Sequence, residues 1–235
     1  MKNKIVLIVL VLFSNQSYTQ SLIGLWEVDE VKVGNQIMTP VAKWTKINRD
    51  NTYESGNGWV QNSVGTWSYN EKTKEYLPLN KYGVLDEFGA FKVSFSNKKM
   101  NWEREEEGVK VIVSLKKITS IPMATGDKLM GLWDLTDAMQ GVENILTTFD
   151  PSNKYYIFFR PDRLYTKRMP DGKRTTGYWH IDAHKPEITL ISENKYESTE
   201  NWRVEVTETD LILYGISGND LNIRLVFKRI NQFPE

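Results

Sequence analysis

Histidine is the side chain best suited to acid–base or metal chemistry at neutral pH, and the chain has two, His180 and His184. On a helix, a spacing of four would place both imidazoles on one face, as a metal-binding pair requires. Asp182-Ala183 between them is instead typical of a hairpin turn. Zinc takes three or four protein ligands, and no third is identifiable. We therefore expect an ordinary strand-end pair and no metal site; His180 or His184 with Asp182 is the best candidate set if the protein is an enzyme.

Other catalytic patterns are absent or have a simpler interpretation. The sequence has no Cys, which excludes a thiol nucleophile, a disulfide and a thiolate metal site. It also lacks a Gly-x-Ser-x-Gly elbow and a Gly-rich phosphate loop. Paired carboxylates can hydrolyse glycosides, but the acidic run Glu103–Glu107 leads into Gly108 and is typical of a solvated hairpin. We predict a protein that is not an enzyme and needs no cofactor.

A basic cluster flanks another predicted hairpin. Lys167-Arg168 and Lys173-Arg174 surround Met169-Pro170-Asp171-Gly172. These charges could meet an anionic partner or a lipid headgroup, but we expect them to keep the hairpin soluble. The balance of 30 basic and 30 acidic side chains argues against a nucleic-acid partner, which would require a basic excess.

The first 19 residues have the pattern of a secretory signal peptide. Lys2 and Lys4 precede an apolar run, Ile5–Phe13, and Ser17 and Thr19 are small residues before a cut at Gln20. The apolar run is too short to span a bilayer as a helix, which needs roughly 20 residues. We expect an exported protein, periplasmic or secreted, without a transmembrane segment. A buried first strand is the alternative interpretation.

The remaining sequence contains an internal duplication, the kind of pattern that fixes domain organisation. Matching blocks recur at a nearly constant offset of 112 residues, with 107 for the first block because the second copy has an insertion near 141–153. Each copy is large enough for its own core. We predict a signal peptide at 1–19, one domain at 20–118, a linker at 119–128 and a second domain at 129–235. The clearest pairs are Gly24-Leu25-Trp26 with Gly131-Leu132-Trp133, Gly65-Thr66-Trp67 with Gly177-Tyr178-Trp179, and Leu115-Lys116-Lys117-Ile118 with Phe227-Lys228-Arg229-Ile230.

Apolar and polar residues alternate with period two along most of each copy, which is typical of strands with one buried face. We predict eight strands in the first copy, near 23–33, 41–48, 52–60, 63–70, 75–79, 89–96, 98–104 and 109–118. The second copy has eight counterparts, near 130–137, 154–160, 163–169, 173–181, 186–191, 200–207, 210–216 and 221–230. Hairpin-linked strands protect their edges best in a closed barrel, so we predict an all-β protein with two tandem eight-stranded antiparallel barrels. A sandwich is the alternative, and Thr136–Thr148 is the segment with helical spacing.

The duplicated Gly-x-Trp on a first strand resembles the signature of lipocalins and other calycins. The later blocks, Gly65-Thr66-Trp67 and Leu77-Pro78-Leu79, resemble bacterial lipocalin-like domains. This resemblance covers about 22–118 and 129–230. It implies that the signature residues Gly24, Trp26, Gly131 and Trp133 are structural. It also implies that a basic residue of the last strand packs over each Trp: Lys116 or Lys117 in copy one, Lys228 or Arg229 in copy two.

Aromatic residues are abundant, with 8 Trp, 11 Tyr and 9 Phe, and many recur in register between the copies. On the alternation they would point largely inward. They could simply fill the barrels, or they could line a pocket for one small hydrophobic or aromatic ligand. The predicted ligand-binding residues are Trp44, Tyr53, Trp67, Phe91, Trp102, Tyr156, Tyr165, Trp179 and Trp202. The alternative function is a non-catalytic interaction module of the cell envelope, with filled barrels and exposed aromatics such as Trp59, Tyr196 and Tyr214.

Overall fold

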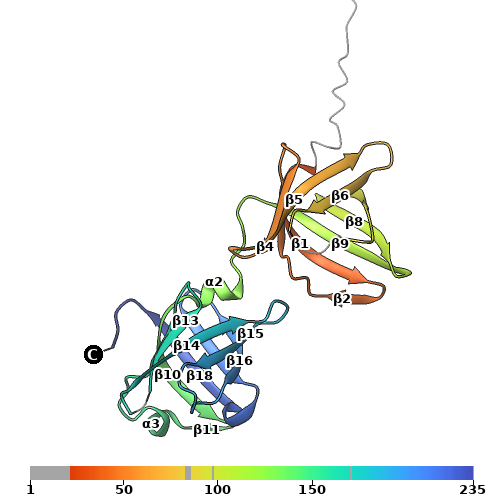
Figure 1. Cartoon of the computed structure of the whole chain (residues 1–235). Coiled ribbons are helices and arrows are strands. Elements are labelled where there is room, and N and C mark those ends of the chain that lie inside the picture. The colour runs from red at the N-terminus through yellow and green to blue at the C-terminus, as the bar shows by residue number, and fades with distance from the viewer. Residues whose placement is uncertain (1–21, 83–85, 97, 170, 235) are drawn as a thin grey trace, which may run out of the picture.

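The computed structural model describes residues 22–82, 86–96, 98–169 and 171–234. Buried and exposed side chains alternate along its strands. In β14 (Arg174–Ile181), for example, Thr175, Gly177 and Trp179 are buried between exposed neighbours. Such strands bury one face each, and the described chain arranges them as two tandem eight-stranded antiparallel barrels (Figure 1). The predicted signal peptide, 1–19, lies outside the described residues.

The first barrel is a continuous antiparallel meander. Its last strand pairs with its first, from Leu25↔Ile118 to Val33↔Val111, and this pairing closes the barrel. A short additional strand, β2, pairs with the far end of β1 and with no other described strand. The strands are β1 (Gly24–Val33), β2 (Gln36–Met38), β3 (Trp44–Ile47), β4 (Thr52–Asn57), β5 (Val60–Asn70), β6 (Glu75–Asn80), β7 (Phe91–Ser96), β8 (Lys99–Glu106) and β9 (Val109–Ile118).

The second barrel repeats this arrangement. β10 pairs with β18 to close it, and β11 is the counterpart of β2. Even the irregularity of the first strand is duplicated, since the register shifts at Val28/Glu30 and at Leu135/Asp137. The strands are β10 (Gly131–Gln140), β11 (Glu143–Asn144), β12 (Tyr156–Phe159), β13 (Leu164–Arg168), β14, β15 (Glu187–Ser192), β16 (Glu200–Val206), β17 (Asp210–Gly215) and β18 (Ile223–Ile230).

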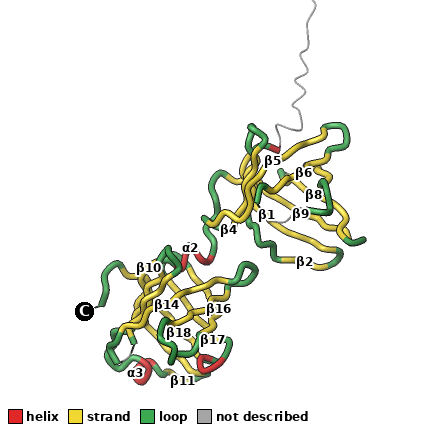
Figure 2. Tube along the Cα trace, in the orientation of Figure 1, coloured by secondary structure: helices red, strands yellow, loops and turns green. Residues whose placement is uncertain are grey.

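Helical structure is confined to short connecting pieces among the described residues (Figure 2). The prediction of helical spacing over Thr136–Thr148 is wrong, because this segment supplies the end of β10, then β11, and only the first three residues of α3 (Leu146–Phe149). Strand pairing with β18 outweighs the helical pattern there. The linker contains a short helix that the sequence analysis did not predict, α2 (Thr125–Leu129), and a 3-10 turn, η1 (Gly218–Asp220), precedes β18.

A tryptophan and a basic side chain pack together at one end of each barrel. Lys117 Nζ lies 5.3 Å from the centre of the Trp26 ring, and the Arg229 guanidinium carbon lies 4.1 Å from that of Trp133. Both indoles donate a hydrogen bond to the backbone carbonyl four residues earlier in the chain. The basic contact expected over each Trp is therefore present in both barrels. We call the opposite end of each barrel its mouth.

Candidate functional site

Seven of the nine predicted ligand-binding aromatics lie on the inward-facing side of their strands. Tyr53, Trp67, Phe91 and Trp102 belong to the first barrel, and Tyr165, Trp179 and Trp202 to the second.

Trp44 and Tyr156 face the other way, which differs from the prediction. Their neighbours along the chain, Ile47 in β3 and Ile157 in β12, contribute to the barrel cores, so the pleat directs the two aromatic rings outward. Trp44 Nε1 donates to the Gly58 carbonyl at 2.7 Å. The Tyr156 ring packs edge-on against Phe233, with 5.2 Å between ring centres.

Aromatic rings form a stacked cluster inside the first barrel. The Tyr76 ring lies 4.8 Å from the Trp102 ring in a stacked arrangement and 6.1 Å from the Trp67 ring. Phe91 approaches Trp102 from the neighbouring strand, with 5.6 Å between ring centres. Strand register explains the cluster, because Tyr76 pairs with Phe91, and Val93 pairs with Trp102. The cluster therefore depends on β6, β7 and β8 being correctly paired.

Two hydrogen-bond donors in this cluster are buried without a partner. The Tyr76 hydroxyl and the Trp102 Nε1 make no hydrogen bond with any described residue. Burial raises the pKa of Tyr76 far above its usual value, so the hydroxyl stays protonated and can donate. At least nine in ten buried polar groups in proteins are hydrogen-bonded, and an unmade bond costs about 1–3 kcal/mol. A water molecule or an acceptor group on a ligand would satisfy both donors.

Arg104 covers the mouth-side edge of this cluster. Its guanidinium carbon lies 4.0 Å from the centre of the Phe91 ring, and its nitrogens contact Asp86 Oδ2 at 2.5 Å and Glu106 Oε1 at 2.6 Å. The acidic run was predicted to be a solvated hairpin, and Glu106 indeed ends β8 immediately before the turn. The sequence analysis missed the role of Arg104, whose side chain lies over an aromatic ring instead of in solvent.

The second barrel contains buried charged groups of its own, at other positions than Tyr76 and Trp102 occupy in the first. Lys167 is 3% exposed and contacts the Glu200 carboxylate, which also accepts a hydrogen bond from Trp202 Nε1 at 3.1 Å. Thr175 donates to Glu197 at 3.0 Å in the same region. The prediction that Lys167 keeps a hairpin soluble is wrong, because it shares the inward face of β13 with Tyr165.

Burial changes the ionisation of this second cluster. Burial, followed by repulsion from Glu200, raises the pKa of Asp220 to about 6. Tyr155, which is fully enclosed, also has its pKa raised well above the usual value, first by burial and then by Glu200 and Asp220. The second barrel therefore has a charged interior near its mouth, in contrast to the neutral aromatic cluster of the first.

No family model matches the sequence, and no curated protein matches it. Among solved structures, the chain is similar to a DUF4847 family protein from Bacteroides vulgatus ATCC 8482. The two share 14% sequence identity with a TM-score of 0.33, and the match covers 45% of this chain and 96% of that one.

The two histidines lie where the barrels approach each other. His180 is in β14, and His184 follows in the β14–β15 hairpin, where its Nδ1 lies 2.8 Å from the Thr39 carbonyl oxygen of the first barrel. Asp182 accepts hydrogen bonds from the backbone amides of His184 and Lys185, as in a tight turn. The described residues contain no group of three or more His, Asp or Glu side chains arranged to hold a metal ion. None of the described helices is long and apolar enough to cross a bilayer.

Proposed function

We propose that this chain is an exported, non-catalytic, lipocalin-like protein that binds a small hydrophobic or aromatic ligand in its first barrel. The observation that supports this function is the pair of buried donors without partners, Tyr76 Oη and Trp102 Nε1, set among aromatic rings. Binding sites of this kind are mostly apolar, with a few polar groups that orient the ligand. The ligand class that fits is a flat, apolar molecule with one acceptor group, such as a carbonyl oxygen.

Arg104 is the group that would open and close this site. Its two carboxylate partners are Asp86, in the connection between β6 and β7, and Glu106, two residues further along β8. The side chain is 11% exposed, so a ligand that enters from the mouth must displace it or pack beneath it. Its cation–π contact with Phe91 holds it over the aromatic cluster when no ligand is bound.

A matched pair of compounds tests the proposed function. We expect 2-acetylnaphthalene, which carries a carbonyl acceptor, to bind the full chain more tightly than 2-ethylnaphthalene, which has none, in a calorimetric titration. Tyr76→Phe should weaken 2-acetylnaphthalene binding by about fivefold to tenfold, because one hydrogen bond is worth about 1 kcal/mol. The same substitution should raise the free energy of unfolding of the free protein by about 1 kcal/mol, since it removes a buried hydroxyl without a partner.

Tyr156→Phe is the control for this experiment. Tyr156 also has a buried hydroxyl without a partner among the described residues, but it lies on the outer face of the other barrel. Tyr156→Phe should therefore change stability in the same direction and leave 2-acetylnaphthalene binding unchanged. Equal binding of the two naphthalenes, or an effect of both Tyr substitutions on binding, would contradict the proposal.

An interaction module with filled barrels is the second candidate function. It is favoured by two strongly exposed aromatics, Tyr196 at 85% and Trp59 at 61%. These residues belong to different barrels, however, and the third candidate, Tyr214, is covered by Arg203 at 4.6 Å and bonded to Glu205. The three therefore do not form a single patch. Binding of neither naphthalene, together with crosslinking of an envelope protein through Trp59 or Tyr196, would favour this alternative.

A further inference from the structure

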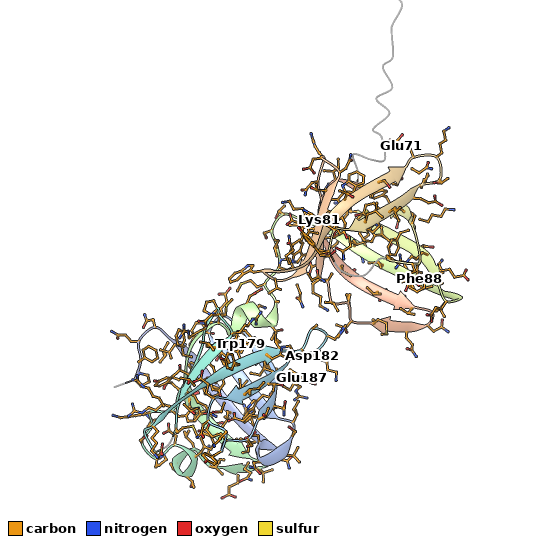
Figure 3. All side chains as sticks on the ribbon, in the orientation of Figure 1. Glu71, Lys81, Phe88, Trp179, Asp182 and Glu187 are labelled. Atoms are coloured by element: carbon orange, nitrogen blue, oxygen red, sulfur yellow. The ribbon has the colours of Figure 1, made fainter. Side chains whose placement is uncertain are left out.

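A cleft of about 840 Å³ lies between the two barrels. One wall is the β14–β15 hairpin, and Figure 3 shows Asp182 and Glu187 on the part of the second barrel that extends toward the first. The other wall comes from β1, the segment 41–43 that precedes β3, and the β4–β5 hairpin of the first barrel, and linker residues 122–127 complete the lining. We call this space the inter-barrel cleft. Its volume falls in the range of sites that take drug-sized molecules, about 300–1,000 Å³.

Hydrogen bonds hold the walls of the cleft and the linker together. Asp127, at the start of α2, is 7% exposed, and its Oδ2 accepts from Trp59 N at 3.1 Å and from Ala124 N at 2.8 Å. One carboxylate therefore ties the linker to the β4–β5 hairpin of the first barrel. The contact between His184 and Thr39 connects the other side. The cleft is thus built by specific polar contacts between the barrels.

Much of the cleft lining is apolar and exposed to solvent. The Tyr178 side chain is 55% exposed, Val60 49%, Met123 44% and Val41 39%. An apolar ligand that covers such side chains is stabilised by roughly 25 cal/mol per Å² of apolar surface removed from water. The lining therefore favours a molecule with an apolar body.

The acidic side chains of the cleft already have partners. Glu27 pairs with Lys116 at 3.1 Å, and Asp182 accepts two backbone amides at 2.7 and 2.9 Å. Asp127 is used by the linker, as described above. These carboxylates are therefore not available to neutralise the basic groups that face the same space.

The cleft has three lysine and arginine side chains, Lys43, Arg163 and Lys185, and none of them makes an ion pair within the described part of the chain. Lys43 has no such partner, and burial lowers its pKa. Arg163 lies with its guanidinium carbon 4.2 Å from the centre of the Trp179 ring, a cation–π contact that engages no N–H group in an ion pair. The cleft therefore combines apolar surface with positive charge that lacks a counter-ion.

We propose that the inter-barrel cleft binds a free amphipathic carboxylate, with its acid group near Lys43 and Arg163 and its apolar body along Val41, Val60, Met123 and Tyr178. A carboxylate would supply the missing counter-charge, and the Arg fork matches its geometry. This site is distinct from the first barrel's interior and does not depend on ligand binding there. It joins residues of both barrels, so a bound ligand would also stabilise their mutual arrangement.

Isothermal titration of the full chain with dodecanoate tests this site. Dodecyltrimethylammonium, with the opposite charge, and 1-dodecanol, which is neutral, are the comparison ligands. The two ionic compounds are used below their critical micelle concentrations, and 1-dodecanol below its solubility limit. We expect dodecanoate to bind at least tenfold more tightly than either. Lys43→Met, which keeps the apolar stem and removes the charge, should weaken dodecanoate binding about tenfold and leave 1-dodecanol binding unchanged or tighter.

Lys72→Met is the matched control, because Lys72 is an exposed lysine on the β5–β6 hairpin, outside the cleft lining. It should leave dodecanoate binding unchanged. Arg163→Met provides a second test if Lys43→Met folds poorly, and it should weaken binding by a similar factor. Tyr76→Phe should have no effect on dodecanoate binding, which separates this site from that in the first barrel. Equal affinity for the three ligands would overturn the proposal. So would dodecanoate affinity that is unchanged both in Lys43→Met and in Arg163→Met.

Discussion

At the scale of single residues, the polar atoms inside the barrels are what distinguish two otherwise similar copies. Trp102 could be selected from the sequence because its counterpart is Leu213. Tyr76 was missed, although the same comparison points to it, since its counterpart is Ile188. A tyrosine where the other copy has isoleucine indicates a hydroxyl inside the barrel. The partner of that hydroxyl is a three-dimensional property, so its absence could not be read from the sequence.

The carboxyl of Asp220 makes stability depend on pH. Its pKa of about 6 in the folded protein lies above its ordinary value, so the folded state binds the proton more tightly than the unfolded chain. Stability is therefore greatest below about pH 4 for this group and falls as pH rises through 6. Because solvent partly screens the carboxyl, we expect a loss of only about 1 kcal/mol. Between pH 4 and pH 7, the change in the free energy of urea unfolding should be about 1 kcal/mol more unfavourable in the wild type than in Asp220→Asn. An equal change in the two proteins would contradict it.

At the scale of elements, the regular strands and their closure into two barrels were predicted from the sequence, and the exceptions to the pattern were not. The predicted range 109–118 coincides with β9, and the other strands agree to within a few residues, because a period of two is a strong signal. The sequence analysis did not find β2, whose three exposed residues carry no alternation. It also placed Trp44 on the wrong face, since a four-residue strand offers too few positions to fix its pleat.

The first glycine of each barrel is expected to tolerate alanine differently. Gly24 has φ of 143° and Gly131 has φ of 136°, a region that disfavours side chains. An added Cβ would meet Lys117 in the first barrel and Arg229 in the second. Arg229 is fixed by three carbonyl oxygens, whereas Lys117 makes one hydrogen bond to a carbonyl and can move.

Gly131→Ala should therefore lower the free energy of unfolding by about 3 kcal/mol, and Gly24→Ala by about 1 to 2 kcal/mol. Thermal unfolding followed by near-ultraviolet circular dichroism measures both. Gly108→Ala is the control for backbone strain alone, because a Cβ there would meet nothing within 4 Å. An equal loss in all three variants would show that the contact with Arg229 contributes nothing.

At the scale of the whole molecule, duplication has produced two barrels with the same strand order and different interiors. The first contains Tyr76 and Trp102 without hydrogen-bond partners in the described chain, and the second contains the Lys167–Glu200 pair with Asp220 near it. A neutral ligand with an acceptor group suits the first interior, because it can accept from the two free donors. It does not suit the second, because it cannot compensate buried charges whose ion pair it would disrupt. The proposed ligand should therefore affect one barrel only.

The indole N–H resonances of the eight tryptophans measure most directly whether the ligand binds in the first barrel only. In a titration of ¹⁵N-labelled protein with 2-acetylnaphthalene, the Trp102 resonance, assigned from Trp102→Phe, should move downfield as its N–H gains an acceptor. The resonances of Trp179 and Trp202, which already donate to Arg160 and Glu200 in the second barrel, should stay in place. A saturating titration that leaves the Trp102 resonance unmoved would contradict ligand binding in the first barrel.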